Sequence, residues 1–384
     1  MPRNSVAIYA PDSAGAYERG VHRVGGAERQ MSLLARTLSD RGHSVAHIVF
    51  PVADPVVPND RLELVQRSAG AARPGMWRNV SEAIQVWRAL RTADAASVIV
   101  RTASPVVGIA AVYCVLHRRR LIFSSANDSD LTVGEVFGSH WYRRALYTLG
   151  LRLSYALVVQ SQQQEELART TFPKLRAVVQ VPSFAETDLS DAGPLEQSAA
   201  DSFLWISRAV EYKQPLKYLE LAEALPDVDF SMVAVPDPAG DDTLLELVRA
   251  RAESISNLEL LDPAPHRIIQ ERIARAVALV NTSRLEGMPN VFLEAWALGV
   301  PVLTLEFDPD GVVARHGLGV AAEGSWQRFV EAASTMWRDR TGRAQRFAGT
   351  RDYVSRFHSV DAVGARWARL LGLEEPLSSP AASR

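Results

Sequence analysis

Short runs of apolar residues alternate along the chain with longer stretches in which apolar residues recur every three or four positions. The short runs are typical of buried strands, and the longer stretches have the spacing of one helix face. Strands that alternate with helices predict parallel sheets covered on both faces, and hence an α/β protein. We expect strands at 5–9, 45–49, 96–100, 121–123, 156–159 and 178–181 in the first half, and at 203–206, 230–233, 258–260, 278–280 and 300–303 in the second.

The first strand leads through a glycine turn into the first helix. Gly25 and Gly26 precede an amphipathic stretch, and the strand 45–49 follows it, which predicts a βαβ unit. The glycines suit a place where backbone approaches a ligand closely, although a plain turn would look the same. The G-x-G-x-x-G spacing is missing, so a nicotinamide or flavin site is not supported.

The length of 384 residues favours two domains. We place them at 1–185 and 200–353, because 187–201 is polar and acidic and contains Gly and Pro. The segment 354–371 is amphipathic, with an apolar face of helical spacing. Residues 374–384 are rich in Ser, Ala and Pro and are expected to be disordered.

The net charge of −2 hides an asymmetry between the halves. Residues 1–185 hold 22 Arg and Lys against 14 Asp and Glu, and the rest hold 20 against 30. Arg118–Arg120 and Arg143–Arg144 lie near Trp141, which favours either a surface for anionic lipid headgroups or a solvated helix face. Neither the charge balance nor a known module supports nucleic-acid binding.

The single cysteine, Cys114, excludes a disulfide framework and a cysteine-rich metal site, and it suits a reducing cytoplasm. The longest apolar run, 105–116, is shorter than the roughly 20 residues that span a bilayer. No secretory signal is expected before the first strand. We therefore expect a cytoplasmic protein, with the inner face of the cell membrane as an additional partner surface.

Two carboxylates, Glu286 and Glu294, stand eight positions apart around a turn and the start of a helix. Pro289 suits the first helical position, and Gly299 suits the residue just after the helix. The free amides of the first turn suit an anion, and both carboxylates can point into one cleft. An ordinary surface helix with a capping acid is the plainer interpretation. The turn consists of Gly287, Met288, Pro289 and Asn290.

A strand that ends at Arg208 is followed five residues later by Lys213. Two cations delivered by a strand end suit a diphosphate, because they offset its negative charge. The chain has only three lysines against 39 arginines, so a lysine at position 213 indicates that this position needs a lysine and not simply a basic residue. A solvated lysine at a helix start remains the alternative.

Together the "GGAERQ" helix start, the Arg208…Lys213 pair and the E-x7-E element resemble the retaining glycosyltransferases of family 4. That family has the GT-B fold, in which two Rossmann-like domains face each other across a cleft. The resemblance implies that 1–185 binds the acceptor, that 354–371 packs back on it, and that 200–353 binds a nucleotide-sugar donor. Ser207 departs from the family's usual glycine and puts only the local backbone geometry in doubt.

The resemblance also implies roles for the candidate residues. Glu286 contacts the donor sugar, Glu294 holds the ribose, and the turn 287–290 faces the phosphates. Gly25 and Gly26 lie near the donor diphosphate. The catalytic group is then Glu286, Arg208 and Lys213.

The family's loop histidine is missing from the stretch after 121–123. Asn127, Asp128 and Asp130 are the acceptor-side candidates there, although they would also suit a helix cap. The resemblance implies front-face transfer with retention of configuration, with no metal and no cofactor beyond the nucleotide-diphosphate sugar.

The predicted function is transfer of a sugar to an acceptor hydroxyl in cell-surface polysaccharide, glycolipid or glycoside biosynthesis. The acceptor would be a sugar, a lipid-linked species or a small-molecule glycoside. Two alternatives stay open. One is a GT-B epimerase or hydrolase that acts on a nucleotide sugar, and the other is a non-catalytic sugar-nucleotide-binding partner subunit.

Overall fold

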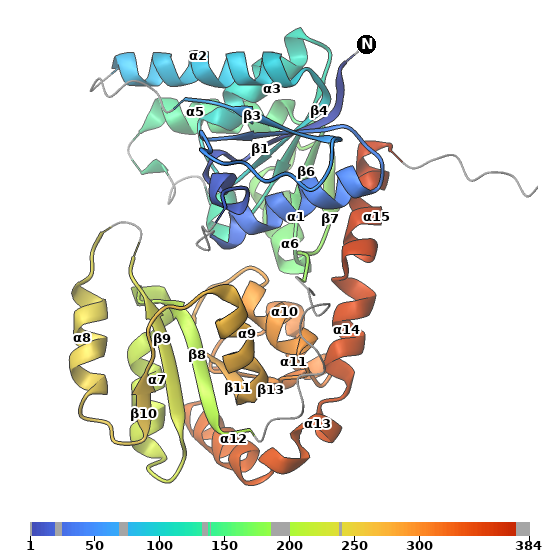
Figure 1. Cartoon of the computed structure of the whole chain (residues 1–384). Helices are drawn as coiled ribbons and strands as arrows, with labels where there is room; N and C mark the ends of the chain where they lie inside the picture. Colours follow the sequence, from blue (N-terminus) through green and yellow to red (C-terminus); the bar gives the residue numbers. More distant parts are fainter. Residues whose placement is uncertain are drawn as a thin grey trace, which may run out of the picture. The chain divides into compact units, whose positions relative to one another are not determined.

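The computed structural model describes residues 2–19, 25–68, 76–132, 137–138, 140–185, 200–237 and 240–373. The chain divides into two compact units (Figure 1). Unit 1 comprises Met1–Ser183 and Val360–Arg384, and unit 2 comprises Phe184–Ser359. The expected disordered tail at 374–384 and nearly all of the expected linker lie outside the described residues.

Unit 1 is built on a seven-stranded parallel sheet in the order β3-β2-β1-β4-β5-β6-β7. The order reverses between β1 and β4, so the carboxyl ends of these two strands mark the switch point of the sheet. The strands are β1 (Asn4–Tyr9), β2 (Val45–Val49), β3 (Leu62–Gln66), β4 (Ala95–Arg101), β5 (Arg120–Ser124), β6 (Ala156–Val159) and β7 (Val178–Gln180).

Helices cover both faces of this sheet (Figure 1). On one face α3 and α5 pack closely, because Gly108 lies against the Leu146 carbonyl and Gly150 against the Val107 backbone, where a Cβ would clash. The helices of unit 1 are α1 (Gly26–Asp40), α2 (Met76–Ala93), α3 (Val106–Leu116), α5 (Trp141–Leu153), α6 (Gln162–Thr171) and α15 (Val360–Leu371), with short 3-10 turns η1 (Pro11–Ala16) and η2 (Asp128–Leu131).

Unit 2 repeats this plan with a six-stranded parallel sheet in the order β10-β9-β8-β11-β12-β13. Here the order reverses between β8 and β11. Along β8, Phe203 and Trp205 belong to one core cluster and Leu204 to the other, as the two-residue period of a strand requires. The strands are β8 (Ser202–Arg208), β9 (Phe230–Val235), β10 (Leu258–Leu260), β11 (Ala276–Asn281), β12 (Val302–Thr304) and β13 (Gly319–Ala321).

Two layers of helices cover this second sheet. The core cluster that contains Phe203 includes buried residues of α7, α8 and α12. The cluster that contains Leu204 includes buried residues of α9, α10, α11 and α14. The helices are α7 (Pro215–Ala224), α8 (Thr243–Ala252), α9 (His266–Arg275), α10 (Asn290–Ala297), α11 (Val312–Arg315), α12 (Trp326–Arg338), α13 (Arg343–Arg346) and α14 (Gly349–Phe357), with 3-10 turns η3 (Glu211–Lys213), η4 (Pro309–Gly311) and η5 (Arg340–Gly342). Among the helices of the described ranges, none is both long and apolar enough to cross a bilayer.

Every strand that the apolar runs predict is present, and two further strands, β3 and β13, were not expected. Both lie at a sheet edge, where a strand has one neighbour.

The segment 354–371 is not one helix that packs back on the first domain. It breaks after Phe357. α14 stays in unit 2, where Tyr353 meets the Trp296 ring at 5.6 Å. Only α15 belongs to unit 1, where Arg41 donates to the Asp361 carbonyl at 2.9 Å. The divisions therefore fall at 183 and 360.

Candidate functional site

The switch point of the second sheet lies at the carboxyl ends of β8 and β11, which is where open parallel sheets bind ligands. β8 ends at Arg208, whose side chain is exposed, and β11 ends at Asn281. The segments that follow the two strands contact each other, since Arg284 N donates to the Tyr212 carbonyl at 2.9 Å. They form one local structure that carries the predicted cation and carboxylate.

Lys213 ends the short η3 turn between β8 and α7. The next residue, Gln214, has φ 48° and ψ 53°, and Pro215 then opens α7. Two bonds fix the backbone at this turn. Thr282 Oγ1 donates to the Lys213 carbonyl at 2.7 Å, and Trp205 Nε1 donates to Thr282 Oγ1 at 3.0 Å. A buried tryptophan of β8 thus helps to set the position of Lys213.

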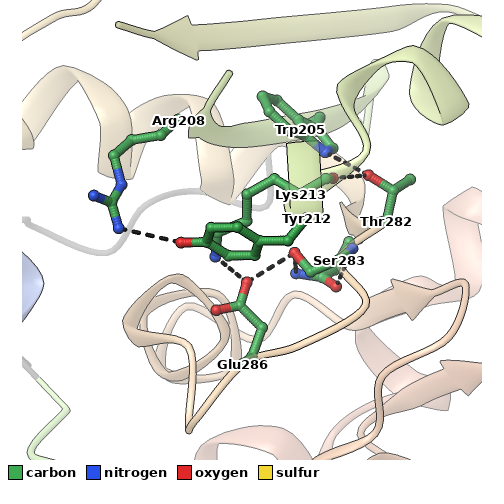
Figure 2. A network of polar contacts seen from close by, with 8 residues as sticks. Trp205, Arg208, Tyr212, Lys213, Thr282, Ser283 and Glu286 are labelled. Atoms are coloured by element: carbon green, nitrogen blue, oxygen red, sulfur yellow. Dashed lines mark hydrogen bonds and ion pairs between the residues drawn. The ribbon is translucent and has the colours of Figure 1, made fainter. Parts of the chain in front are cut away.

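The Lys213 ammonium forms an ion pair with Glu286 Oε1 (Figure 2). Both side chains are almost buried, at 11% and 12% exposed. The same carboxylate oxygen accepts a hydrogen bond from Ser283 Oγ at 2.8 Å. Ser283 N in turn donates to Asn281 Oδ1 at 3.0 Å, so the last residue of β11 holds the loop in place. The structure therefore brings together two of the three residues predicted to be catalytic.

Tyr212 links the third, Arg208, to this pair. Its hydroxyl accepts from Arg208 Nη2 at 3.4 Å, and its ring lies 5.2 Å from the Lys213 ammonium. Burial lowers the pKa of Lys213, although the Glu286 carboxylate opposes the change. Burial also raises the pKa of Tyr212, so its hydroxyl stays a neutral hydrogen-bond partner. The sequence analysis did not identify Tyr212 or Ser283. The only sequence signals for them were that Tyr212 directly precedes Lys213 and that Ser283 follows the buried strand β11.

This arrangement offers a cation held almost out of water, an exposed guanidinium and a fixed carboxylate. An ammonium has three donors, and Glu286 uses only part of that capacity. Two cations against one carboxylate leave a net positive charge, which suits a polyanionic ligand in a site of low effective dielectric. The carboxylate can accept hydroxyl groups of a ligand at the same place.

The turn between the two glutamates ends one residue later than expected. Pro289 is the N-cap of α10, with ψ 125°, and Asn290 is the first helical residue. Gly287 and Met288 form the bend before it. The helix closes as expected, since Gly299 follows it with φ 79°. The predicted helix start is thus present, shifted by one residue.

Glu294 lies on α10 and is buried, with its Oε2 3.3 Å from His266 Nε2. His266 is the first residue of α9. Its side chain is 24% exposed, so it is a partly buried neighbour of Glu294, the residue predicted to hold the ribose. No sequence pattern joins these two residues, because they come from different helices.

Gly25 and Gly26 belong to unit 1, at the start of α1. Gly25 is the N-cap, and the Glu28 carboxylate fills the space that a Cβ on Gly25 would need. A Cβ at this position would therefore require the flexible Glu28 side chain to move. The contact predicted between these glycines and the donor diphosphate stays a prediction.

The acceptor-side candidates make contacts that hold their own loop. Asn127 caps η2 in a capping box with Asp130. Asp130 is buried and accepts from Ala126 N at 2.6 Å and from Ala103 N at 2.9 Å. Burial raises its pKa, and these backbone donors oppose the rise. Asp128 accepts from Gln164 Nε2 at 3.0 Å. These contacts tie the loop to two neighbouring strand ends.

Two of the five arginines expected on a basic patch are engaged elsewhere. Arg119 pairs with Asp94 at 2.9 Å, and Arg120 donates to the Leu371 carbonyl at 2.6 Å. Arg118 and Arg144 are exposed, while Arg143 is partly buried and donates to the Tyr142 hydroxyl at 3.1 Å.

Known proteins resemble this chain in two ways: a family model matches the second unit, and solved structures share the fold of nearly the whole chain. Residues 200–339 match the family model described as glycosyl transferases group 1. "Glycosyltransferase 1 domain-containing protein 1" of Xenopus tropicalis is 28% identical over 127 residues, which are 33% of this chain and 37% of that protein. The match thus spans little more than a third of that relative.

Solved structures resemble the chain over nearly its whole length. Sucrose-phosphate synthase from Thermosynechococcus elongatus has a TM-score of 0.73 at 15% identity, covering 96% of this chain and 98% of that one. Anabaena HepE in complex with UDP-glucose has a TM-score of 0.72 at 15% identity, covering 96% and 100%. WaaG has a TM-score of 0.65 at 17% identity, covering 97% and 100%.

These likenesses confirm the expected fold class, with two α/β domains built on parallel sheets. The match to the family model covers β8, which ends at Arg208, the η3 turn with Lys213, and the loop between β11 and α10 that holds Glu286. The chain therefore has the GT-B fold, and its residues 200–339 match the group 1 glycosyl transferase model.

Proposed function

We propose that this protein is a glycosyltransferase that moves a sugar from a nucleotide-diphosphate sugar to an acceptor hydroxyl. The observation that carries the proposal is the Lys213–Glu286 pair, joined to Arg208 through Tyr212, at the switch point of a group 1 glycosyltransferase domain. The convergence of two cations and a carboxylate supports this proposal, because transfer from a diphosphate needs charge stabilisation at the leaving group.

In this proposal Arg208 and Lys213 stabilise the negative charge that develops on the diphosphate as it leaves. Glu286 accepts hydroxyl groups of the donor sugar, and Glu294 holds the ribose. The bend and helix start at 287–290 face the phosphates with backbone amides. Gly25 and Gly26 are proposed to allow close approach of the diphosphate to the backbone.

We further propose the retaining chemistry of family 4, without a metal or other cofactor. The bond between the anomeric carbon and the diphosphate oxygen breaks as the acceptor oxygen forms its bond on the same face. The diphosphate leaves with the electron pair of the broken bond, and one of its oxygens takes the acceptor proton. Lys213, Arg208 and the helix amides offset the charge that a metal would otherwise neutralise.

UDP-sugars are the first donors to test, because the structurally similar HepE was solved with UDP-glucose. The acceptor is proposed to be a sugar, a lipid-linked species or a small-molecule glycoside in polysaccharide, glycolipid or glycoside biosynthesis. We place the reaction in the cytoplasm.

One face of unit 1 supports a membrane-associated acceptor. The helices α2, α3 and α5 pack side by side and expose large apolar side chains together with arginines. Apolar and basic residues on one helical surface are typical of binding to anionic lipid. We call this surface the apolar-basic face. It consists of Val80, Ile84, Arg88, Arg91, Val112, Val115, Leu116, Arg118, Trp141, Arg144, Leu149 and Arg152.

A screen with UDP-, GDP-, ADP- and dTDP-sugars tests the donor. The matching sugar nucleotide should raise the melting temperature of the wild type, and Lys213→Ala should reduce that rise. An epimerase or hydrolase would convert the sugar nucleotide with no acceptor present, and a non-catalytic subunit would bind it without turnover on any acceptor. Failure of all four nucleotide classes to bind would overturn the proposal.

A further inference from the structure

Unit 1 contains a cavity of about 200 Å³ at the switch point of its own sheet. The carboxyl ends of four adjacent parallel strands form its floor. Tyr9 ends β1, Phe50 follows β2, Arg67 follows β3 and Arg101 ends β4, and all four line the cavity. Ligands bind at this place in open parallel sheets. None of the residues predicted from the sequence to bind donor or acceptor lines it.

Arg67 is a charged side chain buried beneath this cavity, only 5% exposed. Its guanidinium lies between two aromatic rings, 5.7 Å from the Tyr9 centroid and 5.3 Å from the Phe50 centroid. It also donates to the Tyr9 hydroxyl. Among the described residues its Nε has no hydrogen-bond partner. The nearest carboxylate, Glu82, stands 3.8 Å away and is 45% exposed.

Arg101 supplies a second guanidinium on the same cavity. It donates through Nη1 to Ser124 Oγ at 3.0 Å, and its Nε also has no partner among the residues that the structure describes. Burial lowers the pKa of Arg101 to about 10, opposed by Asp130 and Glu28. The side chain therefore keeps its charge at neutral pH. Two charged groups each retain an unsatisfied buried donor, which is costly without a ligand.

Three carboxylates also line the cavity, and their charge must be considered. Asp12 lies in the first turn of η1 and Glu28 in the first turn of α1, where helix N-termini offset negative charge. Glu82 is half exposed and water screens it. The two arginines, in contrast, are positively charged and lie deeper, and the Nε of each has no hydrogen-bond partner among the described residues. The mixture of donors and acceptors suits a ligand with hydroxyl groups as well as a charge.

We propose that this cavity binds an oxyanion, a phosphate or a carboxylate, carried by a small polyhydroxylated acceptor, with Arg67 and Arg101 as the residues that hold it. The description of the ligand as an acceptor rests on the proposed function; the binding site itself does not. The guanidinium groups of Arg67 and Arg101 line the cavity and can donate to the oxyanion, and charge-assisted bonds of this kind are among the stronger ones in proteins. The carboxylates Asp12 and Glu28 can accept the hydroxyl groups.

The test is calorimetric titration of the full-length protein with glucose 6-phosphate, glucuronate and glucose. We expect saturable binding of one or both anions and much weaker binding of glucose. The phosphate alone would indicate a phosphorylated acceptor, and glucuronate alone would indicate a uronic acid. Arg67→Gln and Arg101→Gln should each lower the affinity about tenfold to a hundredfold.

Arg176→Gln is the matched control, because Arg176 is an exposed arginine between α6 and β7 in the same unit. Arg101→Lys keeps the charge and should lose less affinity than Arg101→Gln, even if Arg67→Gln does not fold. The proposal is overturned if glucose binds as tightly as the anions, if neither anion binds, or if both glutamine variants bind them unchanged. The nucleotide that the donor screen selects should bind these variants as tightly as it binds the wild type. Failure of all four nucleotide classes to bind the wild type would count against the proposed function instead.

Discussion

Lys213 and Glu286 form an ion pair in unit 2 although 73 positions separate them in the sequence. Their strands, β8 and β11, are neighbours in the sheet, and the turn after one strand delivers the cation to the loop after the other. Both side chains are nearly buried, so removal of one leaves the other as an uncompensated charge. A variant at either position is therefore expected to affect both side chains of the pair.

Removal of a cation should slow transfer. We expect Lys213→Ala or Arg208→Ala to lower kcat/KM by about 2–4 kcal/mol, because each removes stabilisation of the leaving diphosphate. Lys217→Ala is the matched control. It lies four residues on, is 44% exposed and pairs with Glu220, so its kinetics should stay at the wild-type level. Steady-state kinetics with the best donor provide the measurement, and wild-type turnover by both site variants would reject their assignment.

The two glutamates should separate binding from transfer. Glu294→Gln is expected to weaken the binding of free nucleoside diphosphate, because its proposed partner is the ribose. Glu286→Gln should leave that affinity nearly intact while it greatly slows sugar transfer. Calorimetry with the nucleoside diphosphate, together with kcat, checks both statements. If both variants lose diphosphate binding equally, the proposed division of roles is wrong.

Acid should destabilise unit 1 through His47. This residue is fully buried in β2, its Nδ1 lies 2.6 Å from the Tyr17 hydroxyl, and burial lowers its pKa to about 3. The unfolded chain binds this proton below about pH 6.5, but the folded chain does not. The contribution to stability is therefore complete above pH 6.5 and is lost as the pH falls toward 3, by about 2 kcal/mol at pH 5.

Chemical denaturation at pH 7 and pH 5 measures this loss. His47→Gln should flatten the pH dependence, whereas the control His117→Gln, at an exposed histidine after α3, should not. An unchanged pH dependence in His47→Gln would show that another group is responsible.

The apolar-basic face should bind anionic vesicles. Each arginine near the surface contributes about 1 kcal/mol, so Arg118→Gln, Arg144→Gln and Arg152→Gln together should weaken co-sedimentation by about 3 kcal/mol, roughly a hundredfold. Binding should also fade as salt is raised. The matched control neutralises three exposed arginines of unit 2, Arg249, Arg338 and Arg356. No co-sedimentation at low salt, or binding insensitive to salt, would favour a soluble acceptor.

Much of the architecture follows from local patterns in the sequence. The buried strands are continuous apolar runs, and the glycine after α10 has the positive φ that a helix end favours. Arg208, Lys213 and Glu286 could be proposed because each sits in a short motif of recognisable spacing. The strands β3 and β13 could not, since β3 has two polar residues among its five and β13 begins with a glycine, which has a low strand propensity.

What only the tertiary structure decided is which residues meet. Pairing of β8 with β11 places Ser283 and Tyr212 around the Lys213–Glu286 pair, and packing of α9 on α10 sets His266 beside Glu294. Arg67 and Arg101 converge because the carboxyl ends of β3 and β4 lie at the same end of one sheet, although no spacing in the sequence relates the two residues. Local propensity determines elements over a few residues, whereas burial and pairing between distant elements determine which side chains share a site.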